Sequence, residues 1–223
     1  VGTTDPIQGT IRAHPEAFLS RSVLVCEGAS ETGLMRGLDL FYSSQGTVSL
    51  NALGVALVDA GGVSKIYGRA NVIARLGYRT ASLRDDDVQP DASEEEAFQF
   101  NNGTVFKWAP GQALEHAIFH GVSDAAVHLL LERAIEIHGE DLIAEHISAA
   151  SQSLVTLATC QGPVSPATRQ ILAVASKWKK NAWFKTVTWM EEAARDIIAP
   201  DMANATPAFQ AVVGNIYQWC SGG

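Results

Sequence analysis

Three short runs rich in β-favouring residues in the first half of the chain most constrain its fold. They lie at 22–26, 55–59 and 78–83, and helical patterns at 31–41 and 64–76 separate them. The unbroken apolar character of 22–26 indicates a strand buried on both faces, and short β-rich runs that alternate with helices are typical of a parallel sheet with crossover connections. We therefore predict an α/β fold in this part of the chain, with helices flanking a parallel sheet.

The α/β pattern ends near Pro110. Before that residue, the segment 104–108 predicts an edge strand, and the acidic, proline-containing segment 84–96 predicts a solvated loop. The best break between domains therefore lies near 108–112. We predict that residues 1–110 form an α/β domain.

The second half of the chain has helical periodicity and almost no strand signal. The predicted helices are 124–138, 141–158, 166–180 and 186–198. Ser165-Pro166 and Thr206-Pro207 have the residue types of an N-cap followed by a first-turn proline, so we expect helices to begin there. Residues 111–223 are thus predicted to form an all-α helical domain.

Composition limits the classes of function. The chain has 223 residues, with 16 Lys and Arg against 24 Asp and Glu, so its formal net charge is −8. This excludes a bulk polycation, and affinity for nucleic acid must come from bound cations or a local basic surface. Three widely spaced cysteines argue against a disulfide framework and a CxxC zinc site. Without a membrane-length apolar run or a signal peptide, we predict a cytoplasmic protein.

Acidic residues follow the first and third predicted strands. Glu27 and Glu31 come after the first, and Asp85 and Asp87 come after the third. Because ligands of a parallel sheet gather beyond the carboxyl ends of its strands, we expect these carboxylates to share one rim. Two carboxylates about 4 Å apart repel by roughly 4 kcal/mol at an effective dielectric of 20, so a cation must neutralise them. Oxygen ligands suit Mg²⁺ or Mn²⁺, and two such ions support phosphodiester hydrolysis.

Each acidic motif also has a purely structural interpretation. Glu31 would stabilise a helix dipole from the first turn, and an Asp run after a strand is usually a solvated turn or a helix cap. The Gly61-Gly62 pair after the second strand is not a GxGxxG fingerprint, which disfavours a dinucleotide-binding fold. What favours a shared site is the order of the motifs: Glu after strand one, Gly-Gly after strand two and Asp-x-Asp after strand three.

That order resembles the Toprim domain, the metal-binding module of topoisomerases, primases and several nucleases. The matching segments are 23–28 with Glu31, 58–62 and 83–87. A type I topoisomerase needs a tyrosine nucleophile in further large domains, and a bacterial primase needs a zinc module; this chain has neither the length nor the cysteines. Arg84 and Asp86 flank the Asp pair where the family has a small neutral residue. Which aspartates of this run correspond to the Asp-x-Asp pair of the family, Asp85 and Asp87 or a neighbouring choice, therefore stays open.

Among Toprim proteins, the chain is similar to the overcoming-lysogenization-defect (OLD) family, whose members join an N-terminal ATPase to a C-terminal Toprim nuclease. Segments 108–115 and 179–185 resemble the downstream acidic and Trp-Phe-Lys motifs of that family. The resemblance implies a metal-dependent DNA endonuclease or nickase with two Mg²⁺ or Mn²⁺ ions. It further implies that residues 1–223 are the catalytic C-terminal region, with DNA and an N-terminal ATPase domain as partners and homo-oligomers formed through that missing region.

The resemblance assigns a role to each candidate residue. The expected metal ligands are Glu27, Glu31, Asp85, Asp87 and Glu115. Glu27 is also the expected catalytic base toward the attacking water, and Lys185 would offset charge that develops on the phosphorus oxygens. The alternative for Glu115 is a surface helix acid, with Glu132 taking its place in the metal shell. The alternative for Lys185 is a solvated lysine beside buried aromatic residues.

Basic residues and histidines allow further interpretations. The dense basic cluster, which is interleaved with Trp178, Trp183 and Phe184, comprises Lys177, Lys179, Lys180 and Lys185. It predicts either a surface that guides DNA or cations that complement a helix dipole. His116 and His120 have a zinc-compatible spacing, but without a third ligand motif ordinary surface or interface positions are favoured.

Two other classes of function remain open from the sequence. One is a non-catalytic Toprim domain that only docks on nucleic acid, since the acidic residues would be the same. The other is a magnesium-dependent phosphotransfer module of the receiver type. That module needs a lysine after a fifth strand, which the helical second half does not supply.

Overall fold

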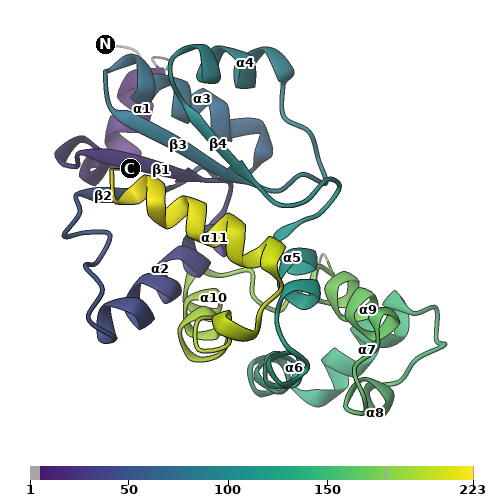
Figure 1. Ribbon diagram of the computed structural model, residues 1–223. Coiled ribbons are helices and arrows are strands. Elements are labelled where there is room, and N and C mark those ends of the chain that lie inside the picture. Colours follow the sequence, from purple (N-terminus) through teal and green to yellow (C-terminus); the bar gives the residue numbers. More distant parts are fainter. Residues whose placement is uncertain (1–5, 179, 223) are drawn as a thin grey trace.

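Four parallel strands form the sheet in the computed structural model, which describes residues 6–178 and 180–222 (Figure 1). They are β1 (Ser22–Cys26), β2 (Val55–Asp59), β3 (Arg79–Arg84) and β4 (Thr104–Lys107). Their order is β2-β1-β3-β4, and every neighbouring pair is parallel. The predicted α/β fold is confirmed, and each strand begins and ends within one residue of its predicted limits.

A helix follows each of the first three strands. These crossover helices are α2 (Ala29–Ser44), α3 (Val63–Arg75) and α4 (Ala92–Phe100), and the short α1 (Pro6–Ala13) and η1 (Pro15–Leu19) precede the sheet. The helices α2 and α3 match the two predicted between the strands. Helix α4 was not predicted.

The predicted loop at 84–96 is wrong in its second half, because α4 begins at Ala92. The Asp91 carboxylate caps this helix by accepting a hydrogen bond from the backbone N–H of Ser93 at 2.9 Å. Since β4 pairs parallel with β3, the chain must cross between them, and α4 is that crossover, with Phe98 fully buried. The acidic residues that suggested a loop stabilise the first turn of the helix instead.

The rest of the described chain is helical. It contains α5 (Leu114–Gly121), α6 (Asp124–His138), α7 (Glu140–Ala150), α8 (Leu157–Cys160), α9 (Pro166–Ser176), α10 (Val187–Ala193), the π-helical turn η2 (Ala194–Ile198), η3 (Met202–Asn204) and α11 (Pro207–Cys220). Within 6–178 and 180–222, no helix is long and apolar enough to cross a membrane.

The predicted helix at 141–158 is in fact two helices. The first, α7, ends at Ala150, and Gln152 and Ser153 then have φ values of 54° and 64°, which a right-handed helix excludes. A new helix, α8, begins after Thr156, whose side chain accepts a hydrogen bond from a backbone N–H of that helix. The apolar periodicity continues across the break because both helices bury residues in the same core.

The two predicted proline caps differ in the structure. Ser165 caps α9, and its hydroxyl accepts a hydrogen bond from the N–H of Thr168 at 3.1 Å. Thr206 precedes Pro207 at the start of α11 but makes no side-chain cap bond. Helix α9 ends at Ser176, short of the predicted limit at 180.

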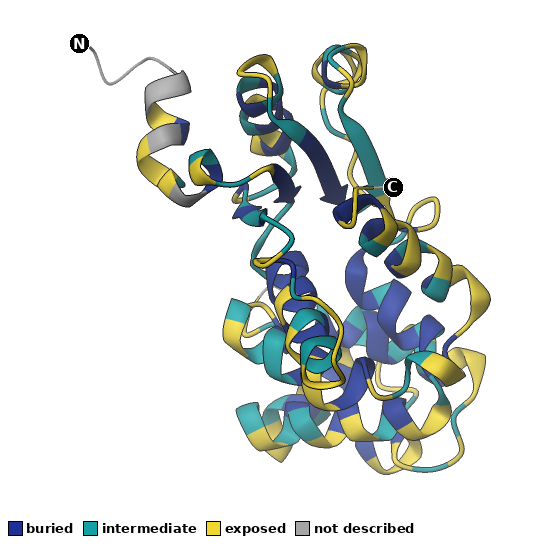
Figure 2. Cartoon of the chain, turned by 60° about the vertical axis from the view of Figure 1, so that its left-hand side comes forward, coloured by how far each residue is buried: buried dark blue, intermediate teal, exposed yellow. Residues whose placement is uncertain are grey.

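The helical region packs directly against the sheet. One cluster of buried apolar residues joins Leu24 of β1 and Leu34 of α2 to Leu172 of α9, and Figure 2 shows buried residues continuing from the strands into the helices below. Gly37 lets α2 approach α10 and η2 closely, since a Cβ there would lie 2.2 Å from the carbonyl oxygen of Glu191. The division at residue 110 stays a prediction.

Helix α11 brings the end of the chain back to the sheet, as Figure 1 shows in yellow. Trp219 lies under the guanidinium group of Arg79 on β3, 4.3 Å from its ring centroid. Phe209, near the other end of α11, stacks on Trp108 with ring centroids 5.6 Å apart. The helix therefore contacts both β3 and the segment after β4.

Candidate functional site

Glu27 joins the carboxyl ends of three strands. It directly follows β1, and its backbone N–H donates to the carbonyl of Leu83 on β3 at 2.8 Å, while its own carbonyl accepts from Gly62 after β2 at 2.8 Å. Gly62 has a φ of 119°, a conformation that favours glycine. The side-chain Oε2 of Glu27 accepts a hydrogen bond from the backbone N–H of Asp85 at 3.1 Å. The carboxylate is thus held at the rim of the sheet.

Glu31 lies in the first turn of α2 and is almost fully buried, at 4% exposure. Its Oε2 accepts a hydrogen bond from the backbone N–H of Gly28 at 2.9 Å, in the manner of a capping box. The structural role that the sequence suggested for this residue is therefore present. It also points the carboxylate toward the end of the sheet, where other acidic groups act on it.

Asp85 connects the end of β3 to the helical region. Its Oδ1 accepts a hydrogen bond from the backbone N–H of Leu114 at 2.8 Å, a contact between residues 29 positions apart. Leu114 is the first residue of α5, so Glu115 lies in the first turn of that helix, where it is 5% exposed. No described residue forms a hydrogen bond or ion pair with the Glu115 carboxylate.

The pKa values place these acids within electrostatic range of one another. Burial raises the pKa of Asp85 to about 9, and the charges of Glu31, Glu115 and Glu27 add to the rise. Burial also raises the pKa of Glu31 to about 7, helped by the negative charge of Glu115. The pKa of Glu27 is raised mainly by burial. Without a cation, the site therefore retains protons on carboxylates near neutral pH.

Both carboxylate oxygens of Asp86 contact groups of the protein itself. Its Oδ1 pairs with Arg84 at 3.2 Å and with Lys107 at 3.0 Å, and its Oδ2 accepts from the backbone N–H of Gly111 at 3.0 Å. The Gly111 N–H and Lys107 lower the pKa of Asp86 to about 2. Arg84 is 1% exposed and also pairs with Glu95 at 3.0 Å. This geometry separates Asp86 from the carboxylates around Asp85.

Asp87 is turned to a different partner. Its Oδ2 forms an ion pair with Lys177, at the end of α9. Asp87 still acts on Glu27, since its negative charge contributes to the raised pKa of that residue. The structure therefore brings Glu27, Glu31, Asp85 and Glu115 together and places Asp87 beside them with its charge already paired.

Lys185 is exposed but is attracted by the same carboxylates. Partial burial lowers the pKa of Lys185, and the charges of Glu115 and Glu31 more than offset this, so the pKa is raised overall. The Ser30 hydroxyl, in the first turn of α2, donates to the carbonyl of Phe184 at 3.2 Å. This hydrogen bond holds the segment before Lys185 against the helix that carries Glu31.

The oxygen ligands that these four carboxylates offer suit a hard divalent cation. The converging acidic groups are all carboxylates, Glu31 and Glu115 among them are buried, and Glu115 has no hydrogen-bond or ion-pair partner among the described residues. An ion that prefers oxygen ligands relieves this combination. Among the residues that the structure describes, no three acidic, histidine or cysteine side chains already stand in a metal-binding arrangement. The four carboxylates are therefore near one another without forming a closed coordination shell.

The remaining sequence candidates lie in varied surroundings. Glu132 is exposed on α6, and His120 contacts the Oε1 of Gln170 through Nε2 at 3.1 Å. Of the aromatic residues in the basic cluster, Trp183 and Phe184 are buried in the core and Trp178 is 41% exposed. Lys179 lies outside the described residues. Sequence reasoning missed the pairing of Lys177 with Asp87 and of Ser30 with Phe184, because nothing local signals contacts between residues 90 and 154 positions apart.

A family model described as "Overcoming lysogenization defect protein-like, TOPRIM domain" matches residues 18–87. This segment is an OLD-like Toprim domain. It contains the rim acids Glu27, Glu31, Asp85 and Asp87, whereas Glu115 and Lys185 lie outside the match. The recognition of a Toprim domain from the order of the motifs is confirmed. The match covers well under half of the chain.

Two solved structures are similar to the chain that carries this Toprim domain. The C-terminal region of the Burkholderia pseudomallei OLD protein is 12% identical, with a TM-score of 0.46 over 90% of this chain and 98% of that one. The C-terminal region of the Xanthomonas campestris pv. campestris OLD protein is 15% identical, with a TM-score of 0.36 over 85% and 99%. At such scores neither similarity supports a conclusion about activity. No curated protein matches the sequence.

Proposed function

We propose that this chain is a metal-dependent DNA endonuclease or nickase that hydrolyses phosphodiester bonds with two Mg²⁺ or Mn²⁺ ions. One observation carries the proposal: carboxylates from the ends of β1 and β3 and from α2 and α5 lie so close that the charges of Glu31, Glu115 and Glu27 help to raise the pKa of Asp85. Such a cluster is costly unless cations neutralise it. The OLD-like Toprim match at 18–87 supports nuclease chemistry as the use of that cluster.

Each carboxylate has a role that follows from its position. Glu31 and Glu115 are almost fully buried, and their charges act on Asp85. We assign these three acids to holding the ions, with Asp87 as a further ligand once it leaves Lys177. Bound ions would activate a water molecule and stabilise the leaving oxygen. Glu27 is held by the N–H of Asp85, so its free oxygen is positioned to bind an ion or to accept the proton of that water.

Lys185 supplies a positive charge beside these acids. Its raised pKa keeps it protonated at neutral pH, and its segment is anchored to α2 by the bond between Ser30 and Phe184. We assign it to stabilising negative charge that develops on the non-bridging phosphoryl oxygens during attack. It is the proposed catalytic residue that belongs to the second half of the chain.

The setting of this activity is also a proposal. The solved OLD structures are described as C-terminal regions, and a larger ATPase-nuclease is the setting we infer for this chain, with an N-terminal ATPase domain, DNA as substrate and oligomers formed outside the present residues. A cytoplasmic location belongs to the same proposal. Because the net charge is −8, bound cations or a local basic surface must offset the repulsion between the protein and DNA.

A plasmid assay tests the activity. Supercoiled DNA is incubated with the protein in Mg²⁺, Mn²⁺ or EDTA, using the wild type and the near-isosteric variants Glu27→Gln and Asp85→Asn. Glu132→Gln, an exposed acid on α6, is the matched control. Cleavage that needs metal, is lost in both site variants and persists in the control supports the proposal. Equal cleavage by all variants refutes it, and metal binding without cleavage favours a domain that only docks on nucleic acid.

A further inference from the structure

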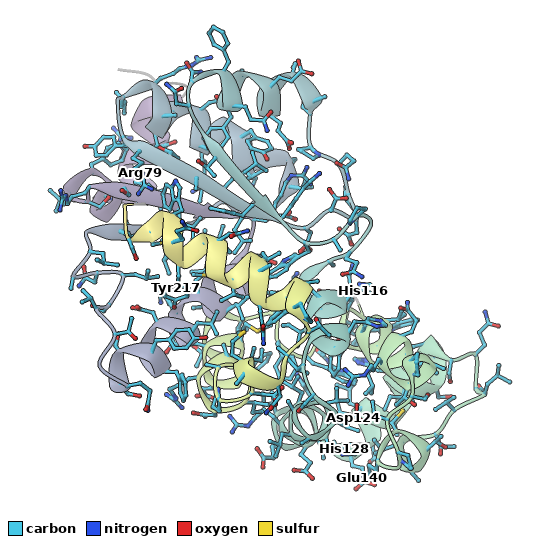
Figure 3. The ribbon with its side chains drawn as sticks, viewed as in Figure 1. Arg79, His116, Asp124, His128, Glu140 and Tyr217 are labelled. Carbon is cyan, nitrogen blue, oxygen red and sulfur yellow. The ribbon has the colours of Figure 1, made fainter. Side chains whose placement is uncertain are left out.

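An apolar pocket adjoins the carboxylate site on the side of α9. It has a volume of about 530 Å³ and is lined by His116, Val174, Lys177 and Trp178. His116 comes from α5 and is labelled in Figure 3, where α5 lies next to α9. The other three residues belong to α9 and the segment after it. None of these residues is needed for the hydrolysis proposed above.

Trp178 gives the pocket an aromatic wall. It is 41% exposed, whereas the neighbouring Trp183 is fully buried, so core packing does not account for Trp178. The ring of Trp178 is supported from within by His146, with ring centroids 6.3 Å apart. An aromatic face that is exposed on one side and supported on the other is the element on which proteins stack unpaired nucleobases.

Lys177 links the pocket to the carboxylate site. Lys177 lines the pocket, and its ammonium group forms an ion pair with Asp87, two residues after Asp85. His116 also joins the two, because it directly follows the buried Glu115 in α5. If the phosphate of a nucleotide reached the carboxylate rim, its base would therefore lie on the side of Trp178. The Lys177 ammonium group would lie between the phosphate and the base.

His116 offers a polar group to such a base. Its Nδ1 is buried and has no hydrogen-bond partner among the described residues. Because no bond at Nδ1 fixes the ring, rotation about the Cβ–Cγ bond exchanges the ring atoms that face the pocket without breaking a hydrogen bond at that nitrogen. An imidazole nitrogen either donates or accepts, according to its tautomer, and so suits the edge of a nucleobase.

We propose that this pocket receives an unpaired nucleobase from the strand whose phosphodiester enters the carboxylate site, stacked on Trp178. The proposal rests on the proposed function in taking DNA as the substrate. A base within an intact duplex cannot enter a pocket of this kind, so the substrate must be single-stranded or must have the base turned out of its stack. The preferred substrates are then single strands, flaps and gaps.

The pocket itself is tested without metal and without a phosphate. The uncharged nucleoside 2-aminopurine deoxyriboside is titrated into the full chain in EDTA, and its fluorescence reports stacking. We expect saturable quenching in the wild type and in Trp178→Phe, and binding roughly tenfold weaker in Trp178→Ala. Phe100→Ala, which removes an aromatic residue that is 88% exposed on α4, is the control and should bind as the wild type does. Absence of saturable quenching, or equal binding by Trp178→Ala, overturns the proposal.

A cleavage experiment then separates this proposal from hydrolysis. Single-stranded oligonucleotides that carry one abasic site at successive positions are cut in Mg²⁺. We expect that, at one position near the scissile phosphate, an abasic site slows cleavage by the wild type. The Trp178→Ala variant should cut the intact oligonucleotide and the one with this abasic site at the same rate. If nucleoside binds but no oligonucleotide is cut, the pocket stands and the hydrolysis proposal fails. If duplex and single strand are cut equally and no position is sensitive, the pocket proposal fails while hydrolysis stands.

Discussion

The Oδ1 atom of Asp85 accepts a hydrogen bond from the backbone N–H of Leu114 at 2.8 Å. This contact fixes the first turn of α5 against the end of β3, and it brings Glu115 next to the acids of the Toprim rim. A carboxylate that belongs to the helical region thereby acts on Asp85 and Glu31. The candidate site is shared between the sheet and the helices, and its properties depend on both.

We expect the metal-free protein to lose stability as the pH rises from about 4 toward 9. The pKa of Asp85 is raised from 3.8 to about 9 and that of Glu31 from 4.5 to about 7, so in this window the folded protein binds protons that the unfolded chain releases. For one proton the loss is at most about 1.4 kcal/mol per pH unit. Thermal unfolding in EDTA at pH 6, 7 and 8 measures the slope. Asp85→Asn should flatten it and Glu132→Gln should not; an unchanged slope in Asp85→Asn contradicts the prediction.

Divalent cations should stabilise the protein more at pH 8 than at pH 6. A cation replaces the protons that the crowded carboxylates hold, so binding releases protons and strengthens as the pH rises. We expect Mg²⁺ to raise the midpoint of thermal unfolding by a few degrees at pH 8, and Mn²⁺ to do the same. Calorimetry in two buffers of different ionisation enthalpy measures the protons released. Binding that is independent of pH, or unaffected by Asp85→Asn, would count against a shared carboxylate site.

Adjacent aspartates should differ sharply in their contribution to stability. Asp86→Ala leaves the buried Arg84 with one acidic partner fewer and removes the acceptor for Gly111, so we expect a loss of about 3 kcal/mol. Asp87→Ala removes an ion pair with a partly exposed lysine, and we expect a loss of less than about 1 kcal/mol. Urea unfolding of both variants gives the comparison. Equal losses would show that Asp86 does not anchor the turn.

Removing the charge of Lys185 should slow cleavage without weakening metal binding. If this lysine stabilises charge on the phosphoryl oxygens, Lys185→Ala lowers the turnover rate by roughly a hundredfold. Its absence removes a cation beside the carboxylates, so affinity for Mg²⁺ should stay equal or increase. Lys180→Ala, at an exposed lysine nearby, is the control. Single-turnover kinetics and a metal titration decide between this role and a solvated lysine, which would leave the rate unchanged.

A side chain at Gly37 should destabilise the protein, because α2 packs closely against α10 and η2 at this residue. A Cβ there would lie 2.2 Å from the carbonyl oxygen of Glu191 and 2.6 Å from the Cβ of Ala194, so Gly37→Ala should destabilise the fold by about 2 kcal/mol or more. Gly68→Ala in α3 meets nothing within 4 Å and should stabilise it by roughly 0.5–1 kcal/mol through helix propensity. Chemical unfolding measures both, and effects of the same sign would contradict the packing described.

Much of the α/β part was predictable because its signals are local. The strands at 22–26 and 55–59 are mostly apolar, and a parallel sheet is the arrangement in which such strands are covered on both faces. Helix α4 escaped prediction because acidic residues serve a helix N-terminus and a solvated loop equally well. The break in the helix at 150–157 escaped it because the apolar period continues on both sides.

The sequence by itself determined the four strands and the helices α2 and α3 between the first three of them, and it placed acidic residues after β1 and β3. Both follow from patterns within a few residues, and the roles of those acids stay proposals. Only the tertiary structure decided which oxygens face one another. It paired Asp86 with Arg84 and Lys107, turned Asp87 to Lys177, and set Glu115 beside Asp85. The physical reason is that these choices depend on burial and on contacts across long separations in the chain, and local periodicity contains no information about either.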